Sequence, residues 1–320
     1  MAINPAPNIA VRRLARFALT TADADRLAAF YSGVFGFRVV SVDRVSGPQF
    51  ERLMGVEGGA TRVTLELGAE ALELLEFDVP GASYPLDADS SDLIFQHFAI
   101  VTTNIDRAFD RLSGASRWSP ISSGGPQRLP KSSGGVSAFK FRDPEGHPLE
   151  LLAFPDGNVP ARWKARSQTA LCLGIDHSAI CVSNSARSIA FYERFGLRAS
   201  ECSLNQGPEQ ARLDGLCDPI VEVTALSPSR KTPHVELLCY RRRKSEPRII
   251  LRNNDVAATR LVFVIDVPSS ELSAPVLPRE VLDPDGHHLL MLPPIASTYR
   301  RDFFQTRLTR LTACAAGARR

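Results

Sequence analysis

One carboxylate in this chain sits where an ionised side chain is costly to bury. Glu150 lies inside the apolar run Leu149–Leu152, at the end of FKFRDPEGHPLELL (139–152), which has the pattern of a strand, a tight turn and a second strand. Pro144 and Gly146 suit the i+1 and i+3 positions of that turn. A buried carboxylate is tolerated when something positive lies against it. Glu150 therefore indicates a metal ion or a basic partner inside the fold.

The same hairpin recurs near the end of the chain, with one informative difference. The stretch DPDGHHLLML begins at Asp283 and places Leu290 where the first copy has Glu150. Another pair of similar stretches, ALELLEF (71–77) and HVELLCY (234–240), keeps its glutamate in both copies. Long, well-spaced similarity of this kind indicates a chain built from repeated units.

The repeated unit has the pattern β-α-β-β-β. In unit one, RFALTT (16–21) alternates as a strand does, and Asp23 then caps a helix that ends at Gly36. Three runs with strand character follow, at 37–42, 61–67 and 71–77.

Unit two begins with IFQHFAIVTTN, in which His97 takes the place that Arg16 has in unit one. A helix at 105–112 and a Gly/Ser-rich loop lead from there to the hairpin that contains Glu150. Unit three begins with GIDHSAICVSNSARSIAFYERFGL, which contains His177 and matches the start of unit one. Units two and three therefore both carry a histidine in their first strand.

The matches divide the chain into two halves of two units each, 11–155 and 171–294, joined by a polar, turn-rich linker at 156–170. Unit four is abbreviated, because between 266 and 277 it has little more than VPSSELSAPV in place of a helix and a long loop. A basic, helix-prone tail follows at 295–320, which we expect to pack on the body or to fray.

Composition limits the class of protein. At 320 residues and 44% hydrophobic, the chain is long enough for two domains of ordinary size. A formal charge of +3, from 38 Lys and Arg against 35 Asp and Glu, argues against nucleic acid as a main partner. The six cysteines show no metal-clip spacing, which favours reduced thiols in the cytoplasm. With no signal-peptide pattern and no run of transmembrane length, we expect a cytoplasmic protein without a membrane segment, either a monomer or a homodimer.

Four such units, with a histidine or its substitute in the first strand and a Glu-Leu step after a DPxGH turn, resemble the vicinal oxygen chelate superfamily. That superfamily includes glyoxalase I, methylmalonyl-CoA epimerase, fosfomycin and bleomycin resistance proteins and the extradiol dioxygenases. The resemblance covers residues 12–292 and implies an α+β fold, in which four βαβββ modules form two cup-shaped mixed sheets with the fourth module truncated. It also implies a divalent metal held in a cup by residues from the first and last strands of two units.

In this resemblance, the metal-binding positions fall on one pair of residues in each unit. From unit one to unit four they are Arg16 and Glu73, His97 and Glu150, His177 and Glu236, and Arg260 and Leu290. If unit one shares a cup with two, and three with four, as in the ring-cleaving dioxygenases, neither cup holds two imidazoles. If unit two shares a cup with three, as in fused glyoxalase-like chains, one cup holds two histidines and two glutamates. We favour this second pairing because it leaves one site whole and the other lost.

Two imidazoles with one or two carboxylates suit a borderline divalent ion: Fe²⁺, Mn²⁺, Ni²⁺, Co²⁺ or Zn²⁺. Chelation of two neighbouring substrate oxygens would make an adjacent C–H more acidic and stabilise an enediolate, and Glu150 or Glu236 could move the proton as general base and acid. This predicts a glyoxalase-like lyase or isomerase that acts on a small vicinally oxygenated substrate.

Two other functions stay open. Binding of the metal by His97, His177 and Glu150 alone would make a facial triad, which indicates a non-haem Fe(II) dioxygenase of the ring-cleaving kind. The other alternative is a resistance-type protein that binds a small molecule without catalysis, although a pure binder has no need of four metal ligands.

Three more residues are candidates for contact with the substrate or with the metal ligands. His234 lies two residues before Glu236 on the same strand face, and Asn205 lies where it could line the mouth of the cup. Arg212 recurs as Arg52 in the paired GP…RL segments, which favours a structural role over binding of an anionic substrate. The histidines near the two DPxGH turns are expected to hydrogen-bond the backbone rather than to bind metal: His147, His287 and His288.

Overall fold

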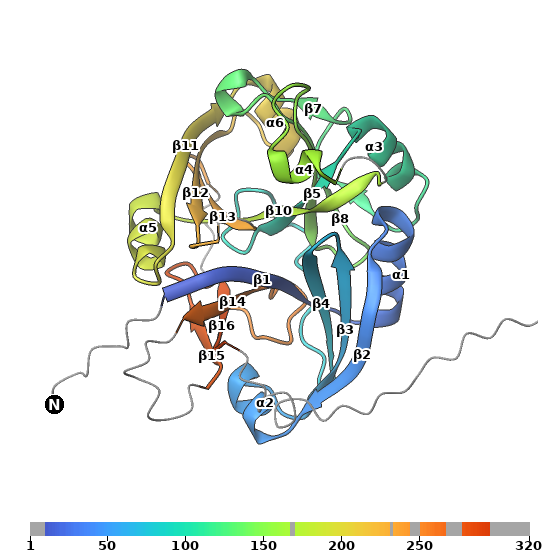
Figure 1. Ribbon diagram of the computed structural model, residues 1–320, viewed down its shortest axis with the longest axis vertical. Coiled ribbons are helices and arrows are strands. Elements are labelled where there is room, and N and C mark those ends of the chain that lie inside the picture. The colour runs from blue at the N-terminus through green and yellow to red at the C-terminus, as the bar shows by residue number, and fades with distance from the viewer. Residues whose placement is uncertain (1–9, 167–169, 231–232, 244–249, 267–276, 295–320) are drawn as a thin grey trace, which may run out of the picture.

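Two mixed β-sheets with helices on their flanks make up the protein (Figure 1). The computed structural model describes residues 10–166, 170–230, 233–243, 250–266 and 277–294. The expected α+β fold of βαβββ modules is confirmed. The predicted tail at 295–320 and the segment 267–276, where unit four was expected to lack a helix, lie outside the described residues.

The first sheet combines units one and four, in the strand order β15-β16-β14-β1-β4-β3-β2. Its strands are β1 (Ala10–Thr20), β2 (Arg38–Ser46), β3 (Gly59–Leu67), β4 (Glu70–Phe77), β14 (Arg260–Asp266), β15 (Arg279–Leu282) and β16 (His288–Leu292). The two units meet where β1 and β14 pair antiparallel.

The second sheet combines units two and three, in the order β11-β12-β13-β10-β5-β9-β8-β6, with β7 paired to β8. Its strands are β5 (Gln96–Thr102), β6 (Ser119–Pro120), β7 (Gln127–Arg128), β8 (Ser137–Arg142), β9 (Pro148–Ala153), β10 (Cys172–Cys181), β11 (Arg198–Gln206), β12 (Ile220–Ser227) and β13 (His234–Tyr240). These units meet where β10 and β5 pair antiparallel. The predicted pairing of unit two with unit three is therefore confirmed.

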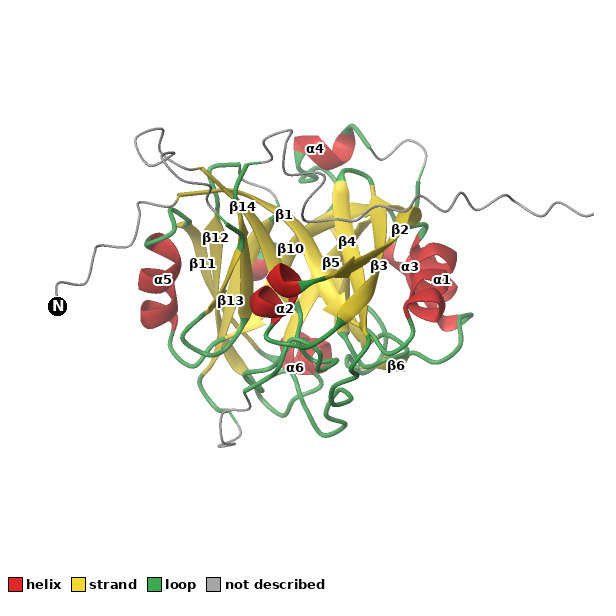
Figure 2. Cartoon of the chain, turned by 90° about the horizontal axis from the view of Figure 1, so that it is seen from below, coloured by secondary structure: helices red, strands yellow, loops and turns green. Residues whose placement is uncertain are grey.

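The helices flank the sheets, with α1 and α3 at one side and α5 at the other (Figure 2). They are α1 (Ala24–Phe35), α2 (Pro48–Met54), α3 (Ile105–Ser113), α4 (Ala161–Lys164), α5 (Ser185–Glu193) and α6 (Pro208–Asp214). As predicted, α1 begins after Asp23, whose side chain accepts the Arg26 N–H, and ends at Gly36 in the left-handed conformation. Among the described helices, none combines the length and the apolarity needed to cross a bilayer.

Three of these helices differ from the predicted pattern. The short helices α2 and α6 fall in the paired GP…RL segments, and each has a proline in its first turn, where the missing N–H costs nothing. Helix α4 lies inside the segment predicted as a linker, and its Trp163 is fully buried. The described part of that segment around α4 is therefore packed against the rest of the protein.

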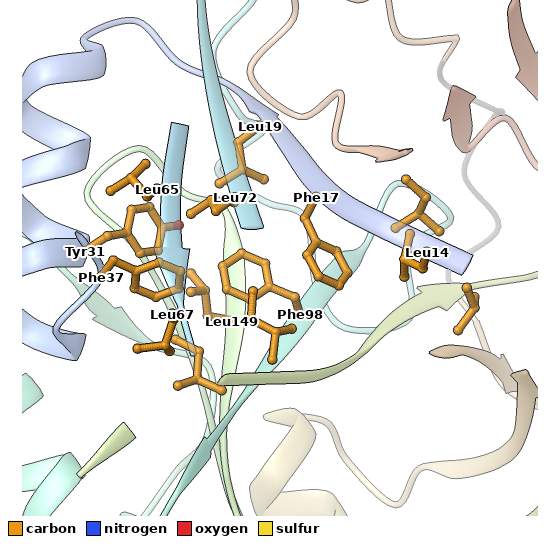
Figure 3. Packing of buried hydrophobic residues seen from close by; sticks show 14 of the residues in the cluster. Leu14, Phe17, Leu19, Tyr31, Phe37, Leu65, Leu67, Leu72, Phe98 and Leu149 are labelled. Carbon is orange, nitrogen blue, oxygen red and sulfur yellow. The ribbon is translucent and has the colours of Figure 1, made fainter. Parts of the chain in front are cut away.

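The main hydrophobic core lies between the two sheets (Figure 3). Phe17 of β1 and Leu72 of β4 come from the first sheet, and Phe98 of β5 and Leu149 of β9 from the second. The rings of Phe17 and Phe98 stack with centroids 5.7 Å apart. The sheets therefore pack back to back, and their opposite faces form two cups that point away from each other.

The first DPxGH turn joins unit two to unit one. The Tyr31 hydroxyl of α1 donates a hydrogen bond to Oδ2 of Asp143 at 2.8 Å. In the same turn, Nε2 of His147 lies 2.9 Å from the backbone oxygen of Thr20 at the end of β1. The backbone role predicted for this histidine is confirmed.

The second DPxGH turn joins unit four to unit three in the same way. The Tyr192 hydroxyl of α5 donates to Oδ2 of Asp283 at 3.2 Å, and Nε2 of His287 lies 2.8 Å from the backbone oxygen of Cys181. Both copies therefore use a tyrosine and a strand end as the docking site. This repetition fixes how each sheet is placed on the other.

His288 differs from its prediction, because its ring contacts a side chain instead of the backbone. It lies on β16, next to β15, and its Nδ1 is 2.7 Å from Oε1 of Glu280.

Candidate metal centre

Two histidines face each other at the junction of units two and three. His97 lies on β5 and His177 on β10, and their ring centroids are 5.9 Å apart. A β-bulge at Asp176 and His177 interrupts the register between the two strands. Bulges re-aim side chains, and with this one the imidazole of His177 comes to lie beside that of His97.

Each histidine has a glutamate on the parallel strand beside it. Glu150 of β9 pairs with the residue two places after His97, and Glu236 of β13 pairs with the residue two places after His177. Oε2 of Glu150 is 3.0 Å from Nε2 of His97, and Oε2 of Glu236 is 3.6 Å from Nε2 of His177. The four residues predicted as metal ligands therefore lie together in one cup.

The donor set fits a divalent cation. His97 is only 2% exposed, yet neither of its ring nitrogens has a hydrogen-bond partner, and its approach to Glu150 lacks the alignment of a hydrogen bond. Buried polar atoms are normally satisfied. One donor atom each from His97, Glu150 and His177 lie within 4.8 Å of one another, and two imidazole nitrogens with a carboxylate oxygen suit a borderline ion. Glu236 stands next to this compact set, on the side of His177.

A second layer of residues surrounds His177, and sequence reasoning missed most of it. Oδ2 of Asp176 is 3.3 Å from Nδ1 of His177, and Oδ1 of Asp176 accepts a hydrogen bond from Nε1 of Trp163 at 3.1 Å. His234 lies 3.4 Å from Glu236 through its Nε2, at the edge of the centre where it was expected. The sequence feature that could have indicated Asp176 is its position directly before His177.

A buried ion pair lies beside Glu150 and was also missed. Lys140 of β8 pairs in register with Glu150, and its Nζ is 2.7 Å from Oδ1 of Asp214. Nε2 of Gln210 donates to the other oxygen of Asp214 at 2.7 Å. The sequence feature that could have revealed this ion pair is the lysine that lies between two buried phenylalanines in the strand FKF.

Burial and neighbouring charges shift the pKa values of these groups. Burial lowers the pKa of His97, and Glu150 offsets this only in part. Burial also opposes the charged form of His177, but the carboxylates of Glu236, Asp176 and Glu150 together outweigh it and raise the pKa to about 9. For Glu236, burial is outweighed by His177, His234 and His97 together, and the pKa is lowered to about 2. His97 is therefore neutral near pH 7, the form in which imidazole binds metal, whereas a metal would displace a proton from His177.

A cavity of about 770 Å³ lies over the four predicted ligands. His234 and Asn205 both line it, and Oδ1 of Asn205 accepts a hydrogen bond from Ser133 at 2.8 Å. Arg212 is not among the described residues that line it, because its Nε donates to Oε1 of Gln127 at 2.6 Å. The structure thus brings two of the three additional candidates to the site.

The cup of the first sheet has a different lining at the corresponding positions. Nε of Arg16 is 3.2 Å from Oε2 of Glu73, and Nη1 of Arg62 is 3.6 Å from Oε1 of Glu73. Arg260 is fully buried, and Leu290 packs in an apolar cluster with residues of α2. Guanidinium groups there stand where the second sheet has imidazoles.

Comparison with known proteins gives a family match for part of the chain and a shared fold for most of it. No curated protein sequence matches the chain. A variant of glyoxalase I from Zea mays has a similar structure, with a TM-score of 0.54 at 15% identity, over 92% of this chain and 97% of that chain. A proposed dioxygenase from Bacillus subtilis has a TM-score of 0.52 at 10% identity, over 89% of this chain and 86% of that chain. Residues 13–151 match the model of the Glyoxalase/Bleomycin resistance protein/Dioxygenase superfamily, and the chain as a whole shares its fold with these structures.

Proposed function

We propose that this protein is a metal-dependent lyase or isomerase, which acts on a small vicinally oxygenated substrate through an enediolate. The observation that carries the proposal is the position of Glu236, which is 3.6 Å from His177 but outside the compact donor set. A carboxylate that borders the ligands and lines the cavity is placed to exchange a proton with a substrate there. The similarity of fold to glyoxalase I supports the proposal.

The residues of the site divide into ligands and a proton carrier. His97, His177 and Glu150 would hold a divalent ion, which when bound polarises two adjacent substrate oxygens and makes the adjoining C–H more acidic. Glu236 then takes that proton on a carboxylate oxygen and, as the resulting carboxylic acid, returns it to the neighbouring carbon. The C–H proton is conserved in this cycle and the hydroxyl proton of the substrate passes between its two neighbouring oxygens, so an isomerisation needs neither oxidant nor reductant.

A second candidate function rests on the composition of the compact donor set. Two imidazoles and one carboxylate are the ligand pattern of non-haem Fe²⁺ dioxygenases. The similarity of fold to the proposed dioxygenase of Bacillus subtilis is in line with it. In that case Glu236 would have no part in holding the metal.

Proton exchange in D₂O tests the first proposal. The protein is loaded anaerobically with Ni²⁺, Co²⁺ or Zn²⁺ and incubated with 2-hydroxy-1-phenylethanone, and NMR follows loss of the carbinol C–H signal. We expect exchange with wild type and none with Glu236→Gln, because an amide keeps an oxygen donor for the metal but cannot accept the proton. Glu73→Gln, at the corresponding position of the other cup, is the matched control and should exchange as wild type does.

Two results would contradict this proposal. Exchange that persists in Glu236→Gln would remove Glu236 from the chemistry. Oxygen uptake with ring opening of a catechol by the Fe²⁺-loaded protein would favour the dioxygenase.

A further inference from the structure

The cavity over the metal centre is larger than its ligands require. Its volume of about 770 Å³ is in the range of sites that enclose drug-sized molecules, roughly 300–1,000 Å³. A substrate of three or four carbons would leave most of this space to water. The substrate therefore has a body beyond its two reacting oxygens.

One wall of the cavity is apolar. It comes from unit two and the segment after it, and consists of Leu129, Val136, Leu152, Phe154, Val159 and Trp163. Val136, Phe154 and Val159 are only partly buried, so a ligand against this wall would remove apolar surface from water. The part of the lining on β11 carries the polar residues Glu201, Ser203 and Asn205. The body of the substrate is therefore apolar and lies on the side of unit two.

The two cations that line the cavity are already paired with carboxylates, so neither requires an anionic substrate. Among the described lining residues, the two with lysine or arginine side chains are Lys140 and Arg162. Lys140 is paired with Asp214 at 2.7 Å, and Arg162 with Glu70 at 2.9 Å. The lining also carries four carboxylates, Glu150, Asp176, Glu201 and Glu236. Because the two cations are already paired with carboxylates outside the lining, these four carboxylates leave an excess of four negative charges. A divalent ion would offset two of them, so an anionic group on the substrate would add to negative charge that has no partner.

The geometry points to an uncharged substrate with an apolar body: a compound that presents two neighbouring oxygens to the metal centre and a ring or branched alkyl group to the wall at Val136, Phe154 and Val159. This inference rests on the proposed function, because it takes the metal centre to hold the two oxygens. Arg162 is paired with Glu70 through Nη2, while its buried Nη1 has no hydrogen-bond partner.

Isothermal titration calorimetry of the Zn²⁺-loaded protein with four probes tests each feature of this substrate separately, through the binding affinity of each probe. The reference is 2-hydroxy-1-phenylethanone. Its 4-carboxylate derivative adds a charge to the same body, hydroxyacetone keeps the oxygens without the ring, and acetophenone keeps the ring without the hydroxyl. We expect the reference to bind at least about tenfold more tightly than the carboxylate and at least about tenfold more tightly than hydroxyacetone.

A different result would contradict each part of the inferred substrate. A carboxylate probe that binds as tightly as the reference overturns the uncharged substrate, and hydroxyacetone that binds as tightly overturns the apolar body. Failure of the proposed function looks different. In that case acetophenone would bind as tightly as the reference, and His97→Ala would not weaken binding of the reference.

Two variants place the probes in the cavity. Phe154→Ala should weaken binding of the reference several-fold and leave hydroxyacetone unchanged, because only the ring contacts this wall. Glu70→Gln removes the carboxylate that balances Arg162 and should strengthen binding of the carboxylate probe. Unchanged affinity of the reference in Phe154→Ala would contradict the assigned wall. If Glu70→Gln does not fold, the probe series on wild type and Phe154→Ala still decide the question.

Discussion

Asp176 lies with its Oδ2 3.3 Å from Nδ1 of His177, while its Oδ1 accepts the indole N–H of Trp163 at 3.1 Å. A carboxylate at the far nitrogen of a metal-binding histidine fixes the tautomer and the orientation of the ring. Trp163 belongs to the segment that joins the two halves of the chain. This segment therefore supports the candidate metal centre as well as connecting the halves.

Asp176→Asn should weaken metal binding by about 10–100-fold. The amide keeps the size of the side chain, but an N–H placed toward Nδ1 favours the tautomer in which Nε2 carries the proton and cannot bind metal. Titration calorimetry with Zn²⁺ gives the affinity, and the visible spectrum of the Co²⁺ form reports the ligand geometry. Thermal unfolding of the metal-free protein is the control, and an unchanged affinity and spectrum would remove Asp176 from this role.

His97→Ala should abolish metal binding, and Glu236→Ala should lower it less. The reason is that His97 belongs to the compact donor set, whereas Glu236 lies beside it. Glu73→Ala is the matched control in the other cup and should leave bound metal unchanged. Elemental analysis of protein loaded with excess Zn²⁺ and then desalted gives the metal content. Loss of metal in Glu73→Ala with retention in Glu236→Ala would show that the wrong cup has been assigned.

Lys140→Met should destabilise the fold by about 3–5 kcal/mol, because it leaves the buried carboxylate of Asp214 without its cation. The double variant Lys140→Met with Asp214→Leu should recover much of that loss, since a buried ion pair is often replaced by apolar groups at little cost. Urea denaturation of the two single variants and the double variant gives the coupling free energy. Additive losses would mean that the two side chains act independently.

The Asp143–His147 pair should stabilise the fold over a limited pH range. Burial opposes both charges, but the partners outweigh it, so the pKa of His147 is raised and that of Asp143 is lowered. The His147 contribution is fully present below its unfolded pKa of about 6.5 and is lost as pH rises through the folded value. The Asp143 contribution is present above its unfolded pKa of about 3.9 and is lost as pH falls through the folded value.

The free energy of unfolding of wild type relative to His147→Gln tests this window. The difference should be largest near pH 5 and should shrink toward both alkaline and strongly acid pH. Urea denaturation at a series of pH values measures it. A difference that is constant with pH would mean that the pair contributes through packing and not through charge.

Much of the candidate site follows from local pattern and repetition. The strands around His97 and His177 alternate or are continuously apolar, and Glu150 and Glu236 stand out in apolar runs that recur along the chain. Loss of the histidine from units one and four also indicates which units share a cup. These features depend on neighbouring residues and on comparison between units, so they can be recognised from the sequence alone.

Other parts depend on contacts between segments that are distant in the chain. Trp163 reaches Asp176 only because α4 packs over the second sheet, and Lys140 meets Asp214 only because α6 closes the cup. In the same way, the position of Glu236 outside the compact donor set depends on side-chain distances that are set only in the folded chain.

The sequence by itself determined the four βαβββ units, the strands that carry the two histidines and two glutamates, and the pairing that brings them into one cup, because hydrophobic period and internal repetition are local properties of a chain. Tertiary structure alone decided which buried charges have partners, what lines the cavity and which of the four candidate ligands form the compact set. Those features arise from burial and from long-range packing, where the energy of a charged group is set by atoms that the neighbouring sequence does not specify.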